Sequence, residues 1–132
     1  MIISLHTFLQ TGTLGESLIG KSAAEVVALL GEPDAKGGTS NKYPHPTIYL
    51  YGIVELTFSQ MAPSLCSSVF VDYEKSATFQ FSQNATITDW PWTSATTREE
   101  AEAYLQDNAL LDTPVRLIFD KDRLCVLYVH QE

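Results

Sequence analysis

Apolar residues recur along this chain at two spacings, and the longer spacing predicts two helices. Ser22 and Thr97 each open a capping box with a glutamate three positions later, Glu25 and Glu100 respectively. After each box the apolar residues fall at intervals of three and four, which places them on one helical face. They are Ala23, Val26, Val27 and Leu30 in the first helix, and Ala101, Tyr104 and Leu105 in the second. Gly31 is expected to end the first helix with left-handed backbone.

The shorter spacing is an alternation of apolar and polar residues, which predicts antiparallel strands. Gly52 is expected in the turn of a first hairpin, and residues 120–123 in the turn of a second. Residues 34–46 are expected to form a loop, and residues 1–10 a short amphipathic helix. The expected strands cover about 48–50, 54–58, 66–73, 78–82, 115–119 and 124–130.

Two parts of the chain share the order helix, strand, turn, strand. The parallel segments are 22–30 with 97–105, 54–59 with 115–120, and Leu65-Cys66 with Leu124-Cys125. One such unit has too little core to be stable alone, so the two are expected to share one sheet. We predict a single α+β domain over residues 1–132. It has an antiparallel sheet of about five to six strands, with two main helices packed on one face. Its two αββ repeats cover about 18–82 and 96–132.

The first unit contains a recognisable pattern. Its helix ends in Leu-Gly-x-Pro at residues 30–33, and residues 51–58 read Tyr-Gly-x-x-Glu-Leu-x-Phe. The pattern resembles a set of short uncharacterised bacterial proteins along most of the chain. More distantly, it is similar to the superfamily of small outer-membrane assembly lipoproteins and β-lactamase inhibitory proteins. That similarity implies helices on an antiparallel sheet and a role in binding other proteins. Unlike in the lipoproteins, neither a signal peptide nor a lipidation cysteine is recognised near Met1, so an envelope role is not expected.

The charge of the chain restricts its partners. Eight Lys and Arg face sixteen Asp and Glu, which gives a formal net charge of −8, and the basic residues form no stripe. Nucleic acids and anionic membranes would repel such a chain, whereas a basic protein partner would complement it. No apolar run has the length of a membrane span, and no secretory signal is recognised. We therefore expect a cytoplasmic protein that is a monomer or weak homodimer.

One segment matches the phosphate-loop pattern G-x-x-x-x-G-K-[ST], in which backbone amides, a lysine and a hydroxyl bind nucleotide phosphates and magnesium. Its pattern residues are Gly15, Gly20, Lys21 and Ser22. The context is unfavourable, because residues 10–14 form a poor strand and the remaining pattern is antiparallel hairpins. Ser22 already has a role as a helix cap. Nucleotide binding is therefore an unfavoured alternative.

The remaining reactive side chains predict no catalytic group, no metal site and no cofactor. The histidines, His6, His45 and His130, lack the spacing of metal ligands. Cys66 and Cys125 fall inside apolar strand patterns, without a basic neighbour to activate a thiolate. Both are expected to be buried structural thiols.

Aromatic residues and the predicted sheet provide the candidate binding residues. The aromatic candidates lie in or beside loops, where such rings often anchor partners. They are Trp90, Trp92, Tyr43, Tyr49 and Tyr51, together with His45. In an alternative interpretation, both tryptophans fill the end of the core. On the exposed sheet face the candidates are Glu55 and Asp72.

The leading hypothesis is a non-catalytic protein-binding domain, with an inhibitor or immunity role as its more specific form. The alternative is a small-ligand-binding or enzyme-accessory domain that uses the 37–46 loop and the tryptophan segment. A hydrophobic pocket beside Trp90 would favour the small ligand. A broad acidic face around Glu55 and Asp72 would favour the protein partner.

Overall fold

A computed structural model describes residues 1–39, 41, 42 and 44–131, which form three helices and eight strands. The helices are α1 (Leu5–Thr11), α2 (Ala23–Leu30) and α3 (Arg98–Asp107). The strands are β1 (Ile2–Ser4), β2 (Ala35–Gly37), β3 (Ile48–Tyr51), β4 (Val54–Phe58), β5 (Cys66–Asp72), β6 (Thr86–Asp89), β7 (Arg116–Asp120) and β8 (Arg123–His130). Within the described ranges, no helix has the length and apolarity that crossing a membrane requires.

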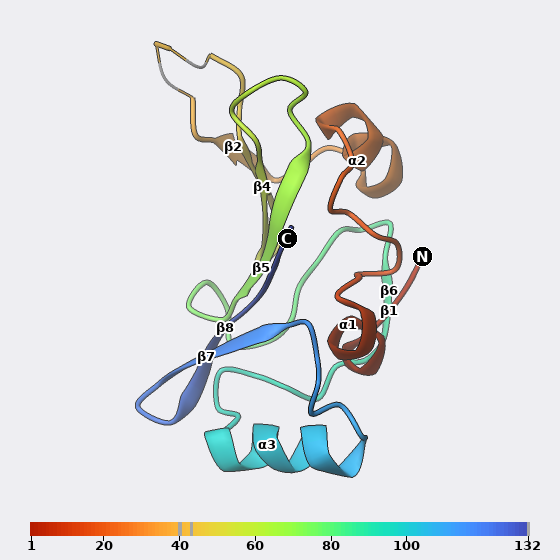
Figure 1. Cartoon of the computed structure of the whole chain (residues 1–132), viewed down its shortest axis with the longest axis vertical. Coiled ribbons are helices and arrows are strands. Elements are labelled where there is room, and N and C mark those ends of the chain that lie inside the picture. The colour runs from red at the N-terminus through yellow and green to blue at the C-terminus, as the bar shows by residue number, and fades with distance from the viewer. Residues whose placement is uncertain (40, 43, 132) are drawn as a thin grey trace.

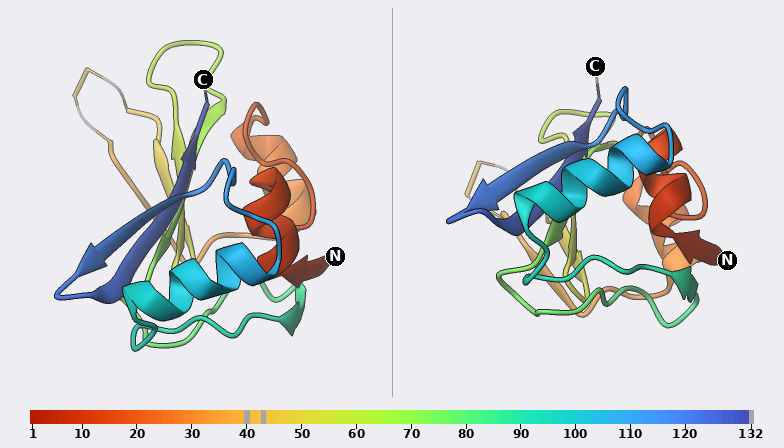
Figure 2. Two further views of the ribbon diagram at one scale, coloured as in Figure 1. Left: turned by 60° about the horizontal axis from the view of Figure 1, so that its bottom comes forward. Right: turned by 90° about the horizontal axis from the view of Figure 1, so that it is seen from below.

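Six of the strands form one antiparallel sheet in the order β2-β3-β4-β5-β8-β7. One face of this sheet is buried and lies toward the helices, as the alternating burial of β4 shows. Figure 1 views the sheet nearly edge-on, with α1 and α2 on one side and α3 across the end near β7. The strong twist of the sheet brings α3 under β7 and β8, which the turned views make visible (Figure 2). The predicted α+β class and six-stranded antiparallel sheet are confirmed.

Both predicted capping boxes are present. The Ser22 hydroxyl accepts a hydrogen bond from the Glu25 amide at 3.2 Å, and the Ser22 amide donates to the Glu25 carboxylate at 3.0 Å. Thr97 and Glu100 form the same pair of bonds, each at 3.1 Å. These reciprocal bonds satisfy amides that the first helical turn leaves without partners.

Three expectations about single elements were wrong. The N-terminal helix is shorter than predicted, because β1 precedes it and pairs in parallel with β6. Part of the expected 34–46 loop is β2, which pairs with β3. The expected strand at 78–82 is absent: its segment bonds to the β3–β4 turn, where the Ile53 amide donates to the Gln80 carbonyl at 3.1 Å. The alternating rings Phe79 and Phe81 pack against the core without entering a ladder.

The two units show matching local geometry. In each, the residue before the helix cap accepts a backbone hydrogen bond from the start of a strand: Cys66 to Lys21 at 2.7 Å, and Leu124 to Thr96 at 2.8 Å. The β4–β5 pair and the β7–β8 pair each have a register shift just before a phenylalanine, Phe58 in β4 and Phe119 in β7. Cys66 thus corresponds to Leu124, one residue away from the match in the sequence comparison. The repeat itself stays a prediction.

Candidate functional site: the open face of the sheet

Three of the aromatic candidates lie in the core. Trp92, Tyr51 and Tyr49 are only 3%, 2% and 7% exposed. The Tyr51 hydroxyl donates to the Gly31 carbonyl at 2.8 Å, and burial is the main reason that its pKa rises to about 12. These side chains stabilise the fold and present no surface to a partner. Tyr43 lies outside the described residues.

Trp90 is half-buried in an aromatic cluster. Its ring stacks on Phe79 with 3.8 Å between centroids and lies 5.7 Å from the ring of Phe8. Its indole N–H donates to the Tyr73 hydroxyl at 2.7 Å, and burial raises the pKa of Tyr73. Both the ring and the N–H of Trp90 are thus engaged within the chain. This placement agrees with the interpretation in which the tryptophans fill the end of the core.

The phosphate-loop match does not have the geometry of a phosphate site. The segment follows helix α1, whereas such a loop follows a strand. The amide of Gly20 donates to the Cys66 carbonyl, that of Lys21 to the Leu18 carbonyl, and that of Ser22 to Glu25. Three successive amides that would have to bind phosphate therefore already have partners.

His45 lines a cavity of about 320 Å³ between the loops that follow β2 and β4. Hydroxyl and amide side chains surround it, but part of this polar lining is engaged locally. The Ser59 hydroxyl donates to the Met61 carbonyl at 2.9 Å, and the Ser64 hydroxyl donates to the Ser59 carbonyl at 2.7 Å. The other lining residues are Thr47, Gln60 and Ala62.

The face of the sheet opposite the helices, here called the open face, brings Glu55 and Asp72 together on adjacent strands. Strand register places Glu55 beside Phe70, Phe70 beside Tyr128, and Tyr128 beside Arg116. This row crosses four strands and has a carboxylate at one end, two aromatic rings in the middle and a guanidinium at the other. The same alternation places Ile118, which is 44% exposed, next to the row on β7.

An aromatic cluster forms the centre of the open face. The rings of Phe70 and Tyr128 stack with 5.7 Å between centroids, and His130 lies 4.7 Å from Tyr128 and 5.6 Å from Phe70. Across the strand pair, the Ser68 hydroxyl and His130 Nδ1 are 2.6 Å apart. This bond fixes the imidazole plane and leaves Nε2 on the other side of the ring.

Carboxylates lie together on the open face where β4 begins and β5 ends. Glu55 forms a 3.4 Å ion pair with Lys75, and Asp72 follows Phe70 by two residues on the same face. Beside them, the Cys125 thiol donates to the Glu74 carboxylate at 3.2 Å. Desolvation, followed by this bond and the charges of Glu74 and its acidic neighbours, raises the pKa of Cys125 to about 11. The thiol therefore stays protonated at neutral pH. The expected burial was wrong for Cys125, which is only partly buried, whereas Cys66 is buried as expected.

A cleft of about 490 Å³ opens at the opposite corner of the open face. Arg116, Tyr128 and His130 of the sheet line it on one side, and the connection before β7 lines it on the other. That connection contributes Asp112, Thr113 and Pro114. The cleft is continuous with the open face, because Arg116 and Tyr128 belong both to the row across the strands and to the lining of the cleft.

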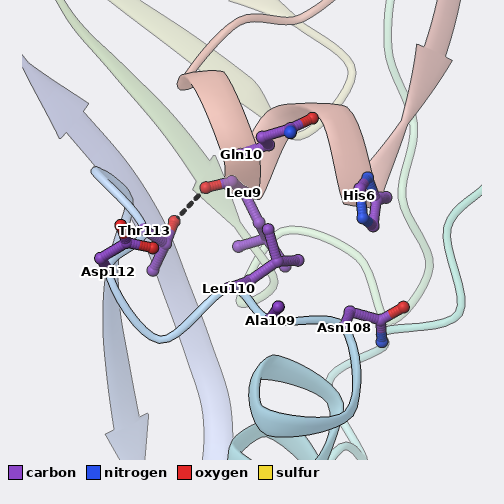
Figure 3. Close-up of a pocket in the computed structure, with 8 residues that line it drawn as sticks. All are labelled: His6, Leu9, Gln10, Asn108, Ala109, Leu110, Asp112 and Thr113. Carbon is purple, nitrogen blue, oxygen red and sulfur yellow. Dashed lines mark hydrogen bonds between the residues drawn. The ribbon is translucent and has the colours of Figure 1, made fainter.

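A second cavity, of about 370 Å³, lies on the far side of the same connection, between α1 and the end of α3. Figure 3 shows His6 and Asn108 at one end and Asp112 with Thr113 at the other. The Thr113 hydroxyl donates to the Leu9 carbonyl and accepts from the Val115 amide. Asn108 donates to the Tyr104 carbonyl at 2.8 Å. Two of the polar side chains that line this cavity, those of Thr113 and Asn108, are therefore already engaged in hydrogen bonds within the chain.

Sequence reasoning missed the residues at the centre of the open face. Phe70, Tyr128, His130 and Arg116 were not among the aromatic or acidic candidates. A signal for two of them was present: Phe70 and Tyr128 occupy the positions of β5 and β8 that alternate with the core residues. Large rings at solvent-facing strand positions indicate an exposed aromatic surface. Their proximity depends on the pairing of β5 with β8, which the sequence pattern alone did not provide.

Comparisons of the chain with family models, with curated proteins and with solved structures gave no match. The resemblance to inhibitor-type proteins stays a prediction. The basis for a functional proposal is therefore the geometry of the open face.

Proposed function

We propose that this chain is a protein-binding domain of the inhibitor or immunity type, and that its open face contacts a partner with a basic surface. The observation that supports this most directly is the stacked pair of Phe70 and Tyr128 at the centre of that face. Strand register places these rings on the face opposite the buried one, and the helices lie on the buried side of the sheet (Figure 1).

The aromatic cluster has the properties of a binding anchor. Tyrosine provides a large contact area with few rotatable bonds, so its immobilisation on binding costs little entropy. The neighbouring rings and the bond between Ser68 and His130 already restrict the cluster in the free protein. A surface ordered before binding loses less conformational entropy when the partner arrives.

Electrostatics favour a basic partner. The net charge of −8 attracts positive surfaces at long range. On the open face itself, Asp72 and Glu55 place carboxylates beside the aromatic centre, and a basic partner would compete with Lys75 for Glu55. Opposite charge on two partners increases the rate of encounter and selects against acidic competitors. An inhibitor or immunity protein needs a rigid surface that matches its target, and a six-stranded sheet supplies such a platform.

The test is affinity capture with four variants of the tagged chain. Ile118→Arg and Glu55→Lys alter the open face. Leu111→Arg and Glu102→Lys make the same chemical changes at exposed positions outside it, since Leu111 is 72% exposed and Glu102 lies on α3. All four proteins must first show native circular dichroism.

We expect one basic protein from the source lysate to bind the wild type and both outside variants, and to be lost from both face variants. The purified partner should bind more weakly in high salt, because screening removes the electrostatic attraction. If that partner is an enzyme, its activity should fall on titration with this chain. A partner lost equally from all four variants, retained by all four, or acidic in character would contradict the proposal.

Small-ligand binding is a second candidate, and the cavity around His45 is the observation that favours it. The tryptophan part of that earlier hypothesis loses its support, because Trp92 is buried and Trp90 is engaged by Phe79 and Tyr73.

A further inference from the structure

The cleft at the corner of the open face holds two opposite charges that do not neutralise each other. Asp112 and Arg116 both line it. The ion pairs among the described residues join Lys36 to Glu32, Lys75 to Glu55 and Arg98 to Asp122, and include neither of them. Arg116 therefore forms no ion pair within the part of the chain that the structure describes, and its guanidinium is available to a carboxylate of a ligand.

Some of the other polar groups of the cleft already form hydrogen bonds within the chain, and others can still contact a ligand. Thr113 is engaged, because its hydroxyl bonds to Leu9 and Val115. His130 uses Nδ1 for Ser68, which leaves Nε2 for a ligand. The ring of Tyr128 stacks on that of its cross-strand neighbour Phe70 and lies beside the ring of His130. The cleft thus combines a guanidinium, a carboxylate and two rings.

We propose that this cleft binds a small zwitterion, a molecule with a carboxylate at one end and an ammonium group at the other. The carboxylate lies against the planar donors of Arg116, and the ammonium group lies against Asp112. The carbon chain between them packs on the ring of Tyr128, which also attracts a nearby cation. This inference concerns the cleft alone and does not require a protein partner on the open face.

A zwitterion fits these groups better than a simple ion does. A lone anion would be attracted by Arg116 but repelled by Asp112. A lone cation would be attracted by Asp112 but repelled by Arg116. A ligand that carries both charges gains from both residues. The volume of about 490 Å³ is in the range of small-ligand sites.

The experiment is a titration followed by amide chemical shifts, with amino acids of increasing charge separation. The probes are glycine, 4-aminobutanoate and 6-aminohexanoate, with propionate and propylammonium as single-charge controls. We expect one zwitterion to shift the amides of residues 112–116 and 128–130 saturably. We also expect it to bind at least about tenfold more tightly than either single-charge control, because both charges contribute.

Variants assign the charges. Arg116→Met and Asp112→Asn should each weaken zwitterion binding at least about fivefold, through loss of one charge–charge contact. Arg98→Met and Asp107→Asn remove the same charges from α3 and should bind like the wild type. Saturable binding of 4-aminobutanoate or 6-aminohexanoate should also persist in Glu55→Lys, which separates this inference from the protein-binding proposal. The proposal is overturned if no zwitterion binds at tens of millimolar, or if Arg116→Met binds as tightly as Arg98→Met.

Discussion

Ala109 adopts left-handed backbone, with φ of 58°, two residues beyond Asp107, the last residue of α3. The Leu110 amide closes the helix end by donating to the Leu105 carbonyl at 2.7 Å, so the chain must turn at this alanine. Glycine reaches this conformation without a Cβ clash. Ala109→Gly should therefore raise the free energy of unfolding, as measured by urea denaturation, because relief of about 1–2 kcal/mol of left-handed strain outweighs the larger unfolded-state entropy of glycine.

The matched control is Ala103→Gly, at an exposed position inside α3. There, glycine should lower the free energy of unfolding by about 1 kcal/mol, because it loses more backbone entropy in a helix than alanine does. Changes of opposite sign in the free energy of unfolding for Ala109→Gly and Ala103→Gly would confirm that the backbone is strained at the end of α3. Equal destabilisation would contradict it.

The two thiols differ in what controls their reactivity. Cys66 is fully buried, and burial raises its pKa to about 11. Cys125 is less buried, and its pKa is raised first by desolvation and then by its hydrogen bond to the Glu74 carboxylate. Glu74→Gln should speed alkylation of Cys125 at pH 8 by roughly 3- to 10-fold, because a larger fraction becomes thiolate. Mass spectrometry of timed iodoacetamide reactions measures this rate, and Cys66 in the same sample should not respond.

At the scale of elements, the capping boxes predict a pH dependence of stability. Hydrogen bonds from Ser22 and Thr97 hold the pKa of Glu25 and Glu100 below the ordinary value of 4.5. A carboxylate with a lowered folded-state pKa stabilises the fold above its unfolded pKa, and this contribution is lost as the pH falls through the folded value. Glu25→Gln should therefore be less stable than wild type at pH 7, and the difference should shrink below pH 4.5. Thermal unfolding across pH 3–7 measures this, and a constant difference would contradict it.

Helices α2 and α3 were predictable because their signals are local: the cap, the glutamate and the apolar face all lie within ten residues. The pairing of β1 with β6 was not predictable in this way. These strands are short and join the two ends of a long stretch of chain, and all four residues of β6 are exposed. Phe79 and Phe81 alternated as strand residues do, but their rings pack on Trp90 and Tyr51 in a segment outside the ladder.

At the scale of the whole molecule, the fold was more predictable than the site. Core positions repeat often enough to indicate the sheet and its helical side. The open face depends on which strands become neighbours, and four strands must align before Glu55, Phe70, Tyr128 and Arg116 form one row. The aromatic residues near loops attracted attention first because rings at loops often bind partners. In this chain Tyr49, Tyr51 and Trp92 were needed to complete the core.

The pairing of β5 with β8 has a consequence for how this protein is made. Ser68 and His130 lie opposite each other but are 62 residues apart in the chain. On the ribosome, β5 therefore emerges well before the strand that will cover its edge. Until then the hairpin of β4 and β5 exposes a ready template for pairing with other nascent chains. The strand pair that joins the first part of the sheet to the last is thus also a point at which the growing chain is exposed to aggregation.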